Sequence, residues 1–118
     1  MTDRSRYRLT PAADSDIAEI LAQTRTRFGT RQHDAYAALI ASALDLAARE
    51  PARFGSKDRG DLEDGVRSFP LSSAAKRRLA AAHVLYYRVV DADGEGIEVL
   101  RVLHRSMDPR VQLPGTQE

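Results

Sequence analysis

The 118-residue sequence contains no cysteine. Disulfide cross-links, thiolate catalysis and cysteine-ligated zinc are therefore excluded, and the composition is compatible with a reducing cytoplasm. No apolar run approaches the roughly 20 residues that a membrane-spanning helix needs. Residues 1–10 are polar and lack the apolar segment of a secretory signal. We therefore expect a cytoplasmic protein that makes no contact with a membrane.

Metal ligands and excess charge are also scarce. His33, His83 and His104 are the three histidines, and no pair of them has the short spacing of a zinc site, so we expect neither a metal nor another cofactor. The 18 basic and 17 acidic side chains give a net charge of +1. Residues 65–90 depart from this balance, because they carry no acidic side chain and five basic ones, Arg67, Lys76, Arg77, Arg78 and Arg88.

The second half of the chain has the pattern of a small β-sheet. Residues 82–91 and 96–104 are rich in β-branched and aromatic residues, and Asp93-Gly94 between them is typical of a hairpin turn. In the second run, positions 97, 99, 101 and 103 are expected on one face of the sheet and positions 98, 100, 102 and 104 on the other. Residues 65–71 predict a further strand, and residues 72–81 fit either a helix or a basic loop.

The first half predicts one short strand and two helices. After a strand at residues 7–10, Thr10 and Pro11 are typical of a helix start. A stripe of residues 17, 20, 21, 24 and 28 is expected to face the core, and Gly29 ends the helix. A second amphipathic helix follows at residues 30–50. The short link between the two helices predicts an antiparallel helical hairpin, and Phe54 is the expected anchor of the connector at residues 51–64.

These elements predict an α+β fold in the order β-α-α-β-β-β. A small antiparallel sheet would carry the N-terminal helical hairpin on one face, with the first strand at an edge. The length suits one domain. We expect this domain to span residues 1–108, followed by a C-terminal tail at residues 109–118.

Five motifs in a fixed order carry a resemblance to a known family. They are YRLTPAADSDIAEI, FGTRQHDAYAALI, GVRSF, HVLYYRV and IEVLRVLHRSMD, and together they cover roughly residues 7–108. In this order they resemble the RelE/ParE superfamily of bacterial type II toxin–antitoxin modules, and most closely its ParE branch. The resemblance implies a RelE/ParE-like fold and a toxin bound in a hetero-oligomer by a cognate antitoxin, often of the ribbon-helix-helix type. ParE-like toxins are described as inhibitors of DNA gyrase, whereas RelE-like relatives cleave mRNA on the ribosome.

Catalysis of RNA cleavage would need a base, an acid and cations for the phosphate. Arg67, His83 and Tyr87 are the candidates for such a site, but the sequence shows no complete acid–base set. Each also has a structural interpretation. Arg67 could pair with a carboxylate at positions 58–64, the histidines could be structural, and one of the adjacent residues Tyr86 and Tyr87 must face the helices.

Binding is therefore the favoured activity, and an enzyme is the less favoured alternative. The basic cluster at residues 76–78 is too small and too poor in aromatic residues to predict autonomous, sequence-specific DNA binding. We expect a toxin that inhibits DNA gyrase by binding, with an antitoxin along its helices and sheet edge. The alternatives are a ribosome-dependent mRNA endonuclease and a relative that merely binds. The candidates for contact with the target or the antitoxin are Arg67, Lys76, Arg77, Arg78, Tyr87, Arg88 and His104.

Overall fold

A computed structural model describes residues 7–75, 81–90 and 96–114 of the chain. The predicted hairpin turn at Asp93-Gly94 and the basic cluster at residues 76–78 lie outside these described residues. The elements, in chain order, are β1 (Tyr7–Leu9), α1 (Pro11–Phe28), α2 (Thr30–Arg49), β2 (Lys57–Asp58), β3 (Val66–Pro70), the 3₁₀ helix η1 (Leu71–Ala74), β4 (His83–Val89), β5 (Ile97–His104) and α3 (Pro109–Gln112). Within the described residues, no helix is long and apolar enough to cross a membrane.

The strands form one sheet in the order β1-β5-β4-β3-β2. Strands β2 to β5 pair antiparallel, as predicted. Strand β1 lies at the edge, also as predicted, but it runs parallel to β5, so the sheet is mixed rather than purely antiparallel. No tight turn joins β1 to β5, and the long path through the helices leaves the direction of β1 free to be parallel. The short strand β2 adds a further edge that the sequence pattern did not predict.

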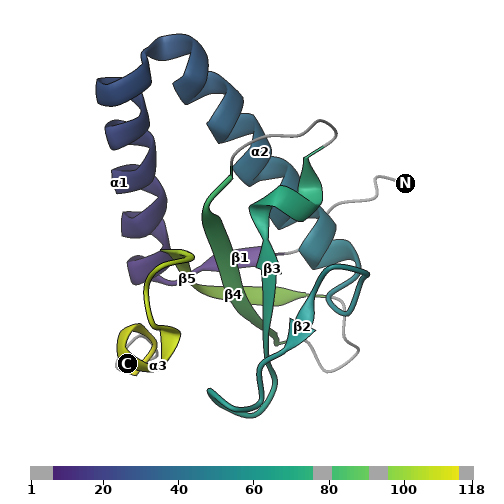
Figure 1. The fold of residues 1–118 in the computed structure, drawn as a ribbon. Coiled ribbons are helices and arrows are strands. Elements are labelled where there is room, and N and C mark those ends of the chain that lie inside the picture. The colour runs from purple at the N-terminus through teal and green to yellow at the C-terminus, as the bar shows by residue number, and fades with distance from the viewer. Residues whose placement is uncertain (1–6, 76–80, 91–95, 115–118) are drawn as a thin grey trace.

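The helices pack as an antiparallel hairpin over one face of the sheet (Figure 1). The Thr10 hydroxyl accepts a hydrogen bond of 3.0 Å from the Ala13 amide, which caps α1, and Gly29 has a φ of +91° at the turn into α2. The core under the helices contains Phe69, Leu85 and Tyr87 from the sheet. The predicted position of Phe28 on the buried stripe is wrong, because its side chain is 67% exposed where α1 extends beyond the sheet.

A second, smaller cluster covers the opposite face of the sheet. Val66, Tyr86, Leu100 and Leu103 pack there with Leu113, which follows α3. The register shifts between Tyr86 and Tyr87. The predicted alternation of β5 holds through Leu100 and is wrong beyond it, because the shift turns Val102 toward the helices and Leu103 toward the second cluster.

The connector between α2 and β3 is held differently from the expectation. Phe54 is fully exposed at 100%, so it is not the anchor, whereas the partly buried Leu62 packs against the second cluster. The predicted tail begins with the short helix α3, and Leu113 behind it is 5% exposed. The boundary between domain and tail at residue 108 stays a prediction.

Candidate functional site

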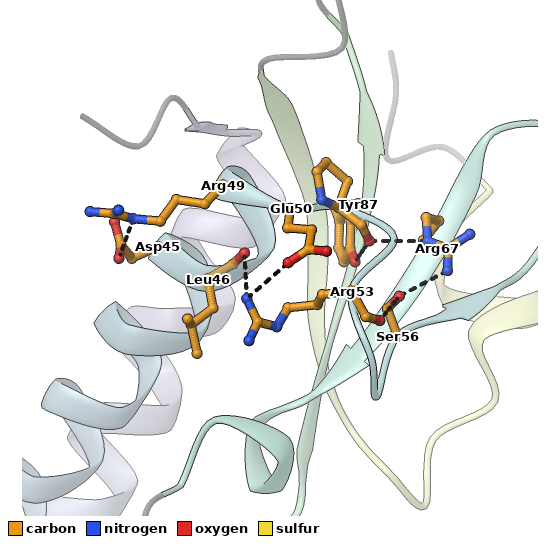
Figure 2. A network of polar contacts seen from close by, with 9 residues as sticks. Asp45, Leu46, Arg49, Glu50, Arg53, Ser56, Arg67 and Tyr87 are labelled. Atoms are coloured by element: carbon orange, nitrogen blue, oxygen red, sulfur yellow. Dashed lines mark hydrogen bonds and ion pairs between the residues drawn. The ribbon is translucent and has the colours of Figure 1, made fainter. Parts of the chain in front are cut away.

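Arg67 and Tyr87 lie opposite each other on β3 and β4 and bind the same backbone carbonyl. Figure 2 shows both side chains converging on the chain that leaves α2. The Tyr87 hydroxyl donates to the Pro51 carbonyl at 2.6 Å, and Arg67 Nε donates to it at 3.1 Å. Arg67 Nη2 donates to the Ser56 hydroxyl at 2.8 Å. The two side chains therefore fasten the connector to the sheet.

These hydrogen bonds limit how far Tyr87 and Arg67 could contact a target or an antitoxin. The side chain of Tyr87 is completely buried, and burial raises the pKa of its phenol above the ordinary value. The hydroxyl therefore stays a hydrogen-bond donor and does not reach the surface. Arg67 is not paired with a carboxylate of the connector, so that structural interpretation is wrong. It is held by a carbonyl and a hydroxyl because its register opposite Tyr87 aims it at Pro51.

His83 and His104 are brought together by the pairing of β4 with β5, in which they lie directly opposite each other. Their rings meet edge to face with centroids 5.3 Å apart. The Tyr36 hydroxyl, from α2, lies 2.7 Å from His83 Nδ1. His104 Nδ1 accepts a hydrogen bond of 3.1 Å from the Ser106 amide. A tyrosine, two imidazoles and a serine thus form a continuous polar row at the end of the sheet.

The electrostatic setting keeps His83 neutral near pH 7. Burial, and then the neighbouring His104, lowers the pKa of His83 below its ordinary value, while Asp16 acts weakly in the opposite direction. Burial also raises the pKa of Tyr36, so its hydroxyl keeps its proton. A neutral imidazole that accepts from a phenol is well suited to a fixed structural contact.

A groove of about 330 Å³ opens beside this histidine pair, between α1 and the end of β5. Its floor is the ion pair of Asp16 with Arg101, made by two hydrogen bonds of 2.7 and 2.8 Å. Asp16 also accepts the Val102 amide at 2.9 Å, and Arg101 donates to the Gln112 carbonyl at 3.0 Å. Hydrogen bonding to Asp16 raises the pKa of Arg101, so the guanidinium stays charged. Arg101 is the one cation among the described lining residues, and its hydrogen-bonding edges are occupied.

The candidate RNA-cleaving residues are not gathered at one place. His83 lies at the groove, four positions before Tyr87 along β4, which corresponds to about 13 Å of extended strand. Arg88 lies near the end of the central strand β4, where it pairs with Glu63 and Glu98 at 3.4 Å each. The candidates Lys76, Arg77 and Arg78 lie outside the described residues.

Sequence reasoning missed Asp16, Arg101 and Tyr36, which build the groove and orient its histidines. One signal was present for Arg101, because an arginine inside the apolar run IEVLRVLH requires a partner when the strand is buried. The identity of that partner, 85 positions earlier in the chain, could not be read from local spacing. Among the described residues, no group of three histidine, aspartate or glutamate side chains could hold a metal ion.

The fold indicates the class of protein to which the chain belongs. A helical hairpin over a small mixed sheet is the α+β arrangement expected of the RelE/ParE superfamily. The family model described as the ParE toxin of the type II toxin–antitoxin system parDE matches residues 7–109. The chain therefore belongs to the ParE toxin family, and the predicted resemblance is confirmed.

Individual relatives agree with this family. Toxin ParE1 of Mycobacterium tuberculosis is 38% identical over 105 residues, covering 88% of this chain and 93% of the relative. Toxin ParE1 of Caulobacter vibrioides is 30% identical over 107 residues, covering 91% of this chain and 96% of the relative. A chain in the crystal structure of the RelBE2 toxin–antitoxin complex from M. tuberculosis is 24% identical with a TM-score of 0.49, covering 87% of this chain and all of that one. That last likeness is too remote to bear on function.

Proposed function

We propose that this ParE-family toxin acts by binding to DNA gyrase in the cytoplasm and is held inactive by a ParD-like antitoxin of the ribbon-helix-helix type. Family membership supports a toxin with an antitoxin as its partner. The relatives are named as toxins, and their names do not state a target. The resemblance of the ordered motifs to the ParE branch is what favours gyrase over the ribosome.

The observation that favours binding over catalysis is the state of Arg101, the arginine that lines the groove beside the histidines, and of the candidates Arg88 and Arg67. Cleavage of RNA needs a positive group that is available to the phosphate in the transition state. Arg101, in the groove, is held by Asp16, and Arg88 is held by Glu63 and Glu98. Arg67 is held by Pro51 and Ser56. The acidic side chains that line the groove would in addition repel a phosphate.

The antitoxin is proposed to lie along α1 and the open part of the β5 edge. Strand β1 pairs with Ile97–Val99 alone, so within the described residues the stretch from Leu100 to His104 has no neighbouring strand on that side. The groove runs beside this stretch. The Leu100 carbonyl and the Val102 amide are already bonded to the side chains of Thr10 and Asp16, so an extended antitoxin segment could add main-chain hydrogen bonds only beyond Val102, while its side chains contact α1. Hydrogen exchange of the complex should show protection at residues 100–107, and unchanged exchange there would contradict this placement.

A ribosome-dependent endonuclease remains the second candidate, because the structure brings His83 and His104 into contact. One experiment separates the two functions. Wild type and His83→Gln/His104→Gln are expressed in bacteria at matched levels, growth is followed, and cellular mRNA is examined by primer extension. We expect growth arrest from both proteins with intact message. Cleavage of message at ribosomal positions by the wild type, abolished in the double variant, would refute binding as the mechanism.

A further inference from the structure

The helical hairpin extends well beyond the sheet that it covers. In Figure 1 the junction of α1 with α2 lies at the end of the molecule away from the strands. The burial pattern agrees, because the fully buried helical residues are Ala13 at the start of α1 and six residues from Leu39 onward in α2. No residue between positions 14 and 38 is fully buried. The distal half of the hairpin is therefore stabilised by contact between the two helices and presents its outer surface to solvent.

The end of this hairpin is positively charged and carries an exposed aromatic ring. Arg25 and Arg27 lie in the last turn of α1, Phe28 ends that helix, and Arg31 lies in the first turn of α2. We call these four residues the hairpin tip. All four are exposed, and Phe28 retains 67% of its accessible surface. Within the described part of the chain, none of the three arginines has a carboxylate partner.

Local helix chemistry explains part of this charge but not all of it. The helix dipole favours cations at the end of α1, which accounts for Arg25 and Arg27. The same dipole disfavours Arg31 at the start of α2, where the first turn contains no acidic residue and Gly29 supplies no side-chain cap. The nearest acidic residue along α2, Asp34, is bonded to His33 at 2.9 Å. Arg31 is therefore placed against the preference of its own helix.

We propose that the hairpin tip docks onto an acidic surface of the protein target of this toxin. Arginine and aromatic side chains are the residue types most enriched at the energetic centres of protein interfaces. A surface that contacts only the phosphates of nucleic acid would use the arginines and leave Phe28 without a role. An acidic protein surface with an apolar recess would engage both the charges and the ring.

The size of the hairpin tip suits contact with the protein target better than contact with the antitoxin. The end of a two-helix hairpin offers a small contact area, whereas a stable complex usually buries about 800 Å² on each partner. A small tip gains that area when it enters a cleft of a larger protein, whose walls also contact the flanks of α1 and α2. The groove beside β5, which we assign to the antitoxin, is lined on α1 by residues between Asp16 and Gln23 and does not include the hairpin tip. This inference rests on the proposed function in one respect, namely that the toxin acts by binding a protein.

Arg31→Glu is the decisive variant, because it reverses the charge and also supplies the acidic residue that the start of α2 lacks. The fold should therefore be as stable as the wild type or more so. Arg31→Lys keeps the charge, and Phe28→Ser removes the ring. Lys57→Glu is the matched control, since it makes the same change of charge at an exposed side chain on β2, away from the hairpin tip and from the groove beside β5.

The full-length proteins are compared in three measurements. These are growth arrest in bacteria at matched protein levels, inhibition of gyrase supercoiling, and binding to the cognate antitoxin by calorimetry. We expect Arg31→Glu and Phe28→Ser to need roughly tenfold more protein for growth arrest and for half-inhibition of gyrase, which is the effect of a lost central contact. Arg31→Lys and Lys57→Glu should stay within about threefold of the wild type, and every variant should bind the antitoxin as the wild type does.

The outcomes separate this inference from the proposed function. If Arg31→Glu arrests growth as the wild type does, the tip does not contact the target and the inference fails. If the wild type arrests growth but does not inhibit gyrase, the proposed target fails while growth arrest still tests the tip. If Arg31→Glu loses antitoxin binding instead, the tip belongs to the antitoxin surface. A binding assay with duplex DNA in the absence of gyrase is added to these three measurements. Loss of that binding in Arg31→Glu, with inhibition of gyrase unchanged, would also overturn the inference.

Discussion

Replacing Asp16 with alanine should cost this protein a large part of its stability. The Asp16 carboxylate accepts two hydrogen bonds from Arg101, at 2.7 and 2.8 Å, and one from the Val102 amide at 2.9 Å. The two side chains are only 14% and 19% exposed. Asp16→Ala therefore leaves a largely buried guanidinium without its counter-ion and a backbone amide without its acceptor.

The expected loss is about 3 kcal/mol of unfolding free energy. Breaking a fully buried ion pair from one side costs roughly 3–5 kcal/mol, and the residual solvent contact here places the value toward the lower end. A domain of this size has a total stability of about 5–15 kcal/mol. The loss should lower the melting temperature by about 10–15 °C, since 1 kcal/mol corresponds to roughly 3–6 °C for a chain of this length.

Urea unfolding followed by circular dichroism measures this effect, and tyrosine fluorescence gives a second signal because the chain has no tryptophan. Asp14→Ala is the matched control, since Asp14 lies two positions before Asp16, in the first turn of α1, and is exposed. It should cost at most about 1 kcal/mol through the helix dipole. A double-mutant cycle with Arg101→Ala isolates the pair. A coupling energy below about 0.5 kcal/mol would refute the claim that this ion pair joins α1 to the sheet.

Three further predictions concern other contacts. Tyr87→Phe should destabilise the fold by about 1 kcal/mol in urea unfolding, because Pro51 loses one of its two donors, and a change below about 0.3 kcal/mol would contradict this. His83 has a lowered pKa in the fold, so the unfolded chain binds more protons and stability should fall as the pH drops below about 6.5. His83→Gln should flatten this dependence between about pH 7.5 and 5.5, and an equally steep dependence in the variant would count against it. Leu113→Ala should cost about 2–3 kcal/mol if the segment after α3 belongs to the fold, whereas a loss below about 0.5 kcal/mol would support a tail that begins at residue 109.

Much of the fold could be predicted because its signals are local. Thr10 and Pro11 start α1 and Gly29 ends it, and these residues act through their own backbone and side-chain chemistry. Hydrophobic periodicity then gave the two helices and the strands of the sheet. The signals that failed depend on distant neighbours. Phe28 has helical spacing but no sheet beneath it, and Phe54 is apolar but has no pocket to enter.

The direction of β1 and the shift in β5 also escaped prediction. The parallel pairing of β1 with β5 depends on how the helical hairpin positions the chain between them. The alternation of apolar and polar residues does not indicate strand direction. The shift opposite Tyr86 inserts one residue into β5, and the run IEVLRVLH is apolar enough on both faces to accept either register.

The candidate site was predicted in part. The sequence proposed Arg67, His83, Tyr87 and His104 as chemistry-bearing residues, and the strand register determines which of them meet. The register places Arg67 opposite Tyr87 and His83 opposite His104. The four residues therefore form two separate pairs and not a single catalytic site. Whether any of these residues contacts the target or the antitoxin stays a proposal.

The proposal that this toxin binds gyrase is tested by titrating the purified full-length protein into gyrase-catalysed supercoiling of relaxed plasmid. We expect loss of supercoiled product as the toxin is added, and recovery when the cognate antitoxin is supplied at an equal concentration. His83→Gln/His104→Gln should inhibit at the same concentrations as the wild type. Undiminished supercoiling at concentrations of protein that arrest growth would contradict the claim that this toxin acts by binding gyrase.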